Sequence, residues 1–145
     1  MIDDAVRELL DRAQIHDLLA RYARGVDRRD LDLVRSCFTD DAAYEGALSK
    51  SDIAQALATL REGLARYTTT MHFIANQVVE LDGDTAHSET YAVAYHRAEG
   101  AGGGEDLVLG VRYRDELVRD AGRWRICHRR AVCDWQRRDP VVVRP

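Results

Sequence analysis

The chain has 145 residues, a length that favours one domain built around a single hydrophobic core. Hydrophobic residues make up 46% and charged residues 32%, a composition that excludes an intrinsically disordered chain. The formal net charge of −4 gives no attraction to phosphate backbones or anionic lipids, so we expect neither nucleic acid nor a membrane as a partner. No apolar run reaches the ~20 residues that span a bilayer, and the N-terminus lacks a signal-peptide pattern, which predicts a cytoplasmic protein.

The first half of the chain has helical periodicity. Apolar residues recur at spacings of three and four from residue 3 to about residue 25, which predicts an amphipathic helix that Gly25 terminates. Shorter helices are expected at residues 30–38 and from Ser51 to about residue 64, with a weak strand at 42–45 between them.

The second half changes to the two-residue period of strands. Four long strands are predicted at residues 68–81, 85–97, 106–118 and 123–135. Tight-turn sequences at residues 82–84 and 120–122 and a glycine-rich loop at 99–105 join them. Connections this short produce antiparallel neighbours, so the predicted fold class is α+β, with N-terminal helices packed on a mainly antiparallel sheet. We expect one domain over residues 1–138 and a C-terminal tail over 139–145.

His72 is the first candidate for chemistry. It stands near the start of the first long strand, where a two-residue period places His72, Ile74 and Asn76 on one face. A histidine on an otherwise apolar face has two interpretations. It is either a core side chain with satisfied hydrogen bonds or a general base oriented by a carboxylate.

Asp27 is the candidate carboxylate. It follows the expected end of the first helix, five residues after Tyr22 on the apolar stripe of that helix, so both side chains could point at the core. The alternatives are structural: Asp27 would cap the next helix, and Tyr22 would pack in the core with its hydroxyl at the surface. The residues by themselves leave both interpretations open.

Four segments carry a resemblance to a known family. They are Tyr22-Ala-Arg-Gly-Val-Asp27, Cys37-Phe-Thr-Asp-Asp-Ala42, Met71-His72 with Asn76, and Gly122-Arg-Trp-Arg-Ile126. Together they resemble the SnoaL-like branch of the NTF2-like superfamily over residues 5–135, and within it scytalone dehydratase, hexachlorocyclohexane dehydrochlorinase and bile-acid dehydratase. The resemblance implies a cone in which helices pack on a strongly curved sheet and enclose an apolar pocket.

The resemblance also implies site residues. In those enzymes an aspartate after the first helix orients a histidine on the first long strand, and these positions match Asp27 and His72. Tyr22 resembles the tyrosine of the bile-acid dehydratase, which favours a hydroxyl or carbonyl partner over a halide. Arg129 matches the cavity arginine of the dehydrochlorinase, although its arginine neighbours in the strand leave the register open.

The implied function is a cofactor-independent lyase, a dehydratase in which His72 abstracts a proton from a hydrophobic alicyclic, steroid-like or polyketide substrate. We expect the pocket to be lined by Val26, Phe38, Ile74, Asn76, Val93 and Trp135. The remaining histidines and the three cysteines lack metal-ligand spacing, so we expect no metal.

Two other functional classes stay open. One is an isomerase or cyclase resembling ketosteroid isomerase, which would use the same enolate. The other is a non-catalytic module that binds a ligand or resembles the small subunit of ring-hydroxylating oxygenases, because one fold serves many functions. In either case we expect a homodimer or homotrimer, since the second face of the sheet needs cover.

Overall fold

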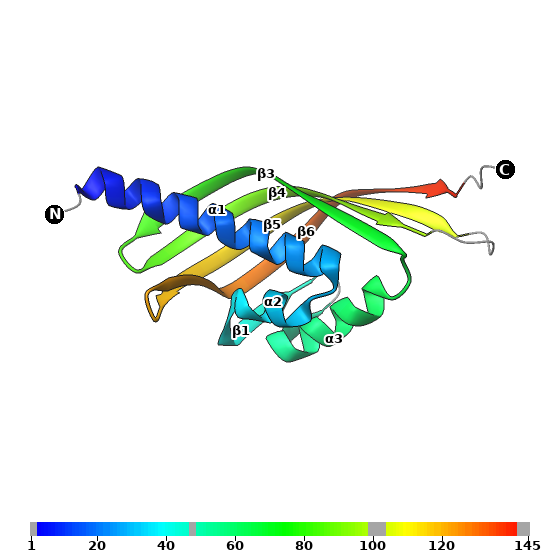
Figure 1. Cartoon of the computed structure of the whole chain (residues 1–145), viewed down its shortest axis with the longest axis horizontal. Coiled ribbons are helices and arrows are strands. Elements are labelled where there is room, and N and C mark those ends of the chain that lie inside the picture. Colours follow the sequence, from blue (N-terminus) through cyan, green and yellow to red (C-terminus); the bar gives the residue numbers. More distant parts are fainter. Residues whose placement is uncertain (1–2, 47–48, 99–103, 142–145) are drawn as a thin grey trace.

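The computed structural model describes residues 3–46, 49–98 and 104–141. In this part of the chain, three helices and six strands follow one another as α1 (Asp4–Arg28), α2 (Leu31–Ser36), β1 (Phe38–Glu45), β2 (Lys50–Asp52), α3 (Ile53–Leu64), β3 (Thr69–Asp82), β4 (Thr85–Arg97), β5 (Glu105–Asp120) and β6 (Arg123–Pro140). The helices pack on one curved, unclosed sheet with the strand order β2-β1-β6-β5-β4-β3 (Figure 1). The predicted α+β class is therefore confirmed.

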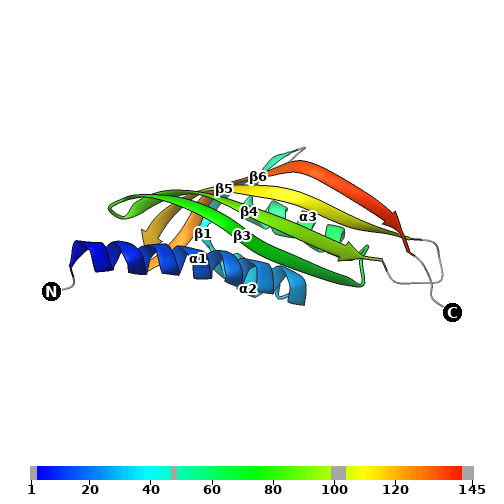
Figure 2. The ribbon, with the colours of Figure 1, turned by 90° about the horizontal axis from the view of Figure 1, so that it is seen from above.

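The sheet is antiparallel except where β1 runs parallel to β6. Figure 2 shows the long strands β3 to β6 arching over α1, and we call the face toward α1 the inner face. Side chains of α1 and of the inner face form one core, which includes Ile15, Leu18, Leu19, Tyr22, Val26, Val79, Ala92, Val111, Tyr113, Leu117 and Ile126. None of the helices in the described residues is both long and apolar enough to cross a membrane.

The first helix is longer than its sequence suggested. The expected end at Gly25 is wrong, because α1 continues to Arg28 and closes at Arg29, whose φ of 57° is left-handed. Gly25 serves close packing instead, since a Cβ on it would lie 2.8 Å from Cγ2 of Val34 in α2. Asp27 consequently lies inside the last helical turn and not in the loop after it.

The elements between α1 and β3 are short. β1 begins at Phe38, before the expected strand at 42–45. The strand β2, which was not expected, pairs with the C-terminal half of β1. Both shorter helices begin at aspartate caps. The side chain of Asp30 accepts the Leu33 N–H at 3.0 Å, and that of Asp52 accepts the Gln55 N–H at 2.8 Å.

The hairpin turns agree with the sequence. Gly83 has a φ of 58° between β3 and β4, and Ala121 and Gly122 have φ of 48° and 76° between β5 and β6. Most of the glycine-rich loop expected at 99–105 lies outside the described residues. β6 runs on to Pro140, into the segment expected as a tail, of which residues 142–145 are not described.

Four irregularities interrupt the strand pairing among the described residues. The register shifts between Phe38 and Ala43 of β1, between Ile74 and Gln77 of β3, and twice along the β5–β6 pair, near Gly110 and near Glu116. An extra residue in one strand reverses which side chains face inward beyond it. These shifts decide which of the expected pocket residues face the interior.

Candidate active site

Asp27 and His72 meet where the end of α1 crosses the start of β3. Oδ1 of Asp27 lies 2.7 Å from Nδ1 of His72, and Oδ2 accepts the backbone N–H of His72 at 2.9 Å. The hydroxyl of Thr70 donates to Oδ1 at 3.0 Å. The carboxylate therefore holds both the ring and the backbone of the histidine, and only 7% of the His72 side chain is exposed.

This contact fixes the tautomer of the imidazole. An ionised carboxylate only accepts hydrogen bonds, so in the neutral ring of His72 the proton is on Nδ1 and Nε2 presents its lone pair. No hydrogen bond of Nε2 occurs within the described residues. The pair thus has the geometry of a base with its orienting acid.

Asp27 stays ionised although its burial and its place at the end of a helix both disfavour the charged form. Burial by itself raises the pKa of Asp27, but the hydrogen bonds from the ring and backbone of His72, its charge and the Thr70 hydroxyl outweigh burial and lower that pKa below 3.8. The C-terminal turn of a helix is also the unfavourable end for a carboxylate. A charge placed against both local preferences is typical of a functional site.

His96 is a site residue that the sequence analysis missed. Its ring is 5.7 Å from the His72 ring and 5.0 Å from that of Tyr67, between centroids. Burial, with the nearby charge of His72, lowers the pKa of His96 below 6.5. Its Nδ1 lies 3.3 Å from the carbonyl oxygen of Leu107, so His96 is a neutral ring that donates there and borders the dyad.

An apolar cavity of about 330 Å³ lies between α3, β1, α2 and the C-terminal part of α1. Tyr22 and Phe38 line it together with Val34, Tyr44, Ile53, Ala56, Leu57 and Leu60. Asp27 and His72 are not among its lining residues. Tyr22 is thus the one candidate catalytic side chain that the structure places in the cavity wall.

Arg129 faces the interior but is not free there. Its guanidinium makes a two-point ion pair with Asp115, from Nε at 2.7 Å and from Nη2 at 2.8 Å, and solvent reaches neither side chain. The guanidinium carbon stacks 4.2 Å from the ring centroids of both Tyr22 and Tyr113. Arg129 therefore packs against the two tyrosine rings and pairs with Asp115. These contacts do not indicate the cavity role that the resemblance implied.

The expected pocket residues divide into two groups. Val26 and Phe38 are buried in the core, and Ile74 packs against it from the inner face. Asn76 is exposed, because the register shift after Ile74 turns it outward and brings Gln77 inward. Their predicted common face is therefore wrong for Asn76.

Val93 and Trp135 also lie on the outer face, so their expected place in the pocket is wrong. Val93 pairs with the outward Phe73, and Trp135, half exposed, pairs with Gly110. An extra residue, Asp134, reverses the alternation of β6 before Trp135.

Within the described residues, no three His, Cys, Asp or Glu side chains are grouped to hold a metal ion. The three cysteines are free, with Cys37 buried, Cys127 half-buried and Cys133 exposed.

Comparison with known proteins places this chain in a family. Residues 7–130 match the SnoaL-like domain family. The uncharacterised protein Rv2910c of Mycobacterium tuberculosis is 31% identical over 129 residues, which cover 86% of each chain.

Two solved structures share the fold. A candidate scytalone dehydratase from Novosphingobium aromaticivorans aligns with a TM-score of 0.81 at 18% identity, over 90% of this chain and 88% of that one. Type 2 hexachlorocyclohexane dehydrochlorinase (LinA) aligns with a TM-score of 0.79 at 19% identity, over 95% and 93%. The resemblance inferred from the sequence is confirmed.

Proposed function

The chain belongs to the SnoaL-like domain family of the NTF2-like superfamily, and on that premise we propose that it is a cofactor-independent lyase, a dehydratase with His72 as its base. The observation that supports this proposal is the Asp27–His72 contact of 2.7 Å. It selects the tautomer of the neutral ring in which Nδ1 carries the proton and Nε2 can accept one, as proton abstraction from carbon requires.

In the proposed reaction, Nε2 of His72 removes a proton from the carbon next to a substrate carbonyl group. The C–H electron pair forms an enolate, whose oxygen accepts a hydrogen bond from the Tyr22 hydroxyl. The enolate then expels the β-hydroxyl group, which takes the proton back from Nε2 and leaves as water. A C=C bond remains, and the atoms balance without another reactant.

The cavity beside Tyr22 suggests the substrate class. Its wall is apolar except for hydroxyl groups, which suits an alicyclic or polyketide compound with few polar atoms. A volume of about 330 Å³ is at the small end for ligand pockets, which favours one or two rings over a complete steroid.

The test is turnover of β-hydroxy ketones and β-hydroxyacyl thioesters by the His72→Ala variant. We expect loss of water to slow by about 10²–10⁴-fold, the usual contribution of a general base. His87→Ala, at an exposed histidine on β4, is the matched control and should keep full activity. Comparable activity in folded His72→Ala would rule out the general-base role.

An isomerase or cyclase would use the same base, because an enolate can be reprotonated instead of losing hydroxide. Incubation in deuterated water separates the two reactions. Deuterium entering recovered substrate without loss of water would favour the isomerase.

A ligand-binding module is favoured by one observation, the separation of the dyad from the lining of the apolar cavity. Tight binding of a ligand with no turnover, unchanged in His72→Ala, would support that function.

A further inference from the structure

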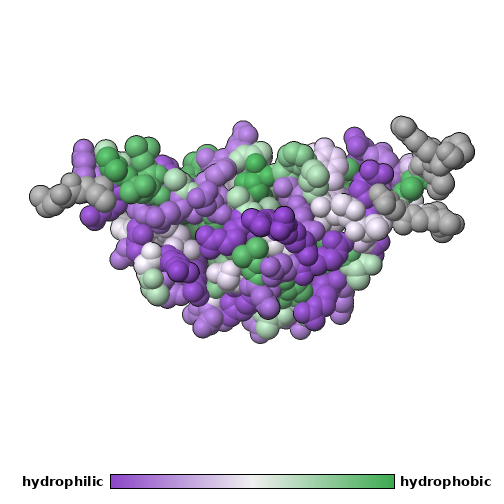
Figure 3. Space-filling model, viewed as in Figure 1, coloured by the Kyte–Doolittle hydropathy of each residue, from purple (hydrophilic) through white to green (hydrophobic). Residues whose placement is uncertain are grey.

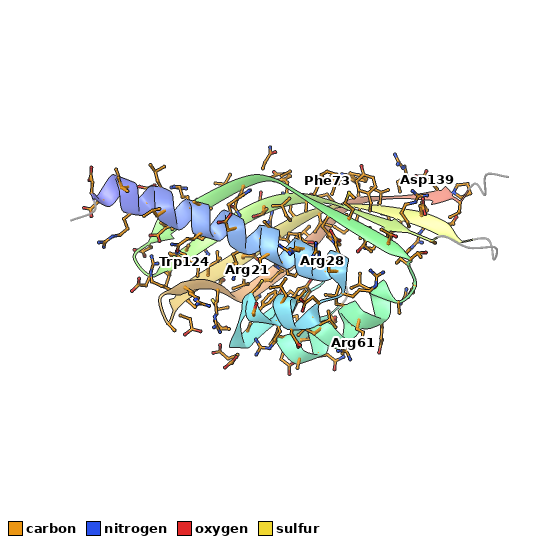
Figure 4. The ribbon with its side chains drawn as sticks, in the orientation of Figure 1. Arg21, Arg28, Arg61, Phe73, Trp124 and Asp139 are labelled. Atoms are coloured by element: carbon orange, nitrogen blue, oxygen red, sulfur yellow. The ribbon has the colours of Figure 1, made fainter. Side chains whose placement is uncertain are left out.

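Thr70, near the start of β3, is a third side chain in the hydrogen-bond network of the dyad. Its hydroxyl donates to Oδ1 of Asp27 at 3.0 Å, and only 5% of the residue is exposed. Strand alternation places Thr70 and His72 on the inner face, and Figure 4 shows Phe73 of the same strand on the side away from α1. Thr70 and His72 therefore reach the carboxylate of Asp27 from one strand.

Two donors of β3 hold this carboxylate independently of the imidazole. The Thr70 hydroxyl binds Oδ1, and the backbone N–H of His72 binds Oδ2 at 2.9 Å. One donor on each oxygen fixes how the carboxylate is turned. The ring of His72 therefore contacts an acceptor whose orientation is already set.

The Thr70 hydroxyl and the His72 ring share one oxygen of Asp27. Nδ1 of His72 lies 2.7 Å from Oδ1, the atom to which Thr70 donates. A carboxylate oxygen has two lone pairs, so the hydroxyl takes one and leaves the other to the ring. A hydrogen bond to the charged form also makes the carboxylate a weaker base, so that it attracts the Nδ1 proton less strongly.

Asp27 lies at the border between the core and solvent. Its side chain is 23% exposed, and Figure 3 shows a mainly hydrophilic surface over the C-terminal part of α1. Water competes there for the carboxylate, whereas Thr70 is buried and its β-branched side chain has few rotamers. Burial raises the pKa of Asp27, the hydrogen bonds and charge of His72 lower it, and the Thr70 hydroxyl adds to this lowering.

We propose that Thr70 is a positioning residue of the reaction, whose hydroxyl orients Asp27 and limits how strongly Asp27 attracts the Nδ1 proton of His72. The inference rests on the proposed function, because it assigns a further residue to the same base. Thr70 acts only through Asp27. Without its hydroxyl, the carboxylate turns more freely and binds the ring more tightly, so the base is less well aligned and keeps its proton to higher pH.

The kinetic test compares two substitutions of Thr70. Thr70→Val replaces the hydroxyl by a methyl group of similar size, and Thr70→Ser keeps a hydroxyl. For loss of water from a β-hydroxy ketone, we expect Thr70→Val to lower kcat about 10-fold at unchanged KM and to move the acid limb of the kcat/KM profile to higher pH. Thr70→Ser should retain the parental values. A change in KM alone, or equal impairment by both substitutions, would overturn the proposal.

Thr39→Val is the matched control. Thr39 is also a buried threonine, 7% exposed, and its hydroxyl has no hydrogen-bond partner among the described residues. The substitution is chemically the same but removes no contact to the dyad. We expect parental kinetics and an unchanged pH profile, and the same shift as in Thr70→Val would overturn the proposal.

Proton NMR tests Thr70 without any substrate. The Nδ1 proton of His72 gives a low-field resonance while it is bound to the carboxylate, and its loss in His72→Ala identifies it. We expect this resonance to move farther downfield in Thr70→Val and to stay in place in Thr70→Ser and Thr39→Val. An unmoved resonance in Thr70→Val with an unchanged circular dichroism spectrum would overturn the role of Thr70 in an active enzyme too. The expected shift in a protein without turnover would support that role and overturn only the proposed lyase.

Discussion

Arg129 and Asp115 are enclosed completely, and their energetics follow from that enclosure. Removing a guanidinium and a carboxylate from water costs several kcal/mol for each ion, which their mutual contact offsets. Burial lowers the pKa of Arg129, but the charge and hydrogen bonds of Asp115 outweigh it and raise that pKa overall. One guanidinium nitrogen, Nη1, is buried without a hydrogen-bond partner among the described residues, so no second partner there compensates the guanidinium if Asp115 is lost.

Asp115→Ala should therefore be severely destabilising, because it leaves an uncompensated cation in the core. We expect the free energy of unfolding to decrease by about 3–5 kcal/mol, measured by urea denaturation. Asp134→Ala, which breaks the solvent-exposed pair with Arg112, is the matched control and should change stability little. Equal effects of the two substitutions would contradict the role assigned to the buried pair.

The sequence identified both members of the dyad, Asp27 and His72, but not the neighbouring His96. Paired from the turn at Gly83 without interruption, the hairpin would set His72 opposite the outward Tyr95, on the face away from His96. The shift after Ile74 sets His72 opposite Ala94 instead, so His72 lies on the inner face together with His96. Period and turn chemistry predict a strand and its partner, whereas an inserted residue that forms a bulge has no comparable local pattern.

α3 is the element that covers the cavity. Ala56 faces the cavity from this helix, and Ala58 is exposed on its other side. If the cavity receives substrate, Ala56→Leu fills part of the space without touching the dyad. We expect KM to rise about 10-fold with the fold retained, while Ala58→Leu leaves steady-state kinetics unchanged. An unaltered KM in Ala56→Leu would move the substrate to another surface.

The ends of elements show where sequence reasoning succeeds and fails. The β3–β4 and β5–β6 hairpins were predicted because their turns need residues at positive φ, and Gly83 and Gly122 supply them. The helix end expected at Gly25 was wrong because a glycine that ends a helix and one that permits close packing look alike in sequence. The strand β2 was missed since three residues, Lys50–Asp52, carry no detectable period.

For the molecule as a whole, two carboxylates, the buried Asp11 and the partly buried Asp27, connect α1 to the sheet near both of its ends. Near its start, Asp11 accepts Nη2 of Arg119 at 2.7 Å and the indole N–H of Trp124 at 3.0 Å. Near its end, Asp27 binds His72. Burial raises the pKa of each carboxyl group, but these hydrogen bonds outweigh burial and hold both pKa values below 3.8.

Acid should therefore loosen the helix from the sheet. A carboxyl group whose pKa is lower in the folded than in the unfolded chain stabilises the fold fully above its ordinary pKa. We expect the free energy of unfolding to decrease as pH drops below 3.8 and through the lowered folded values, measured by denaturation at a series of pH values. Asp27→Asn should have a shallower acid slope, and an unchanged slope would contradict the assignment.

The bulge in β3 divides that strand into two parts with separate duties. Before it, Thr70, His72 and Ile74 face inward at the dyad, and beyond it Gln77 donates to the Thr90 hydroxyl of β4 while the carbonyl oxygen of Val79 accepts from Arg12 of α1. A change of side chain in one part does not disturb the alternation in the other. Substitutions around the dyad can therefore leave the contacts between β3 and α1 beyond the bulge in place.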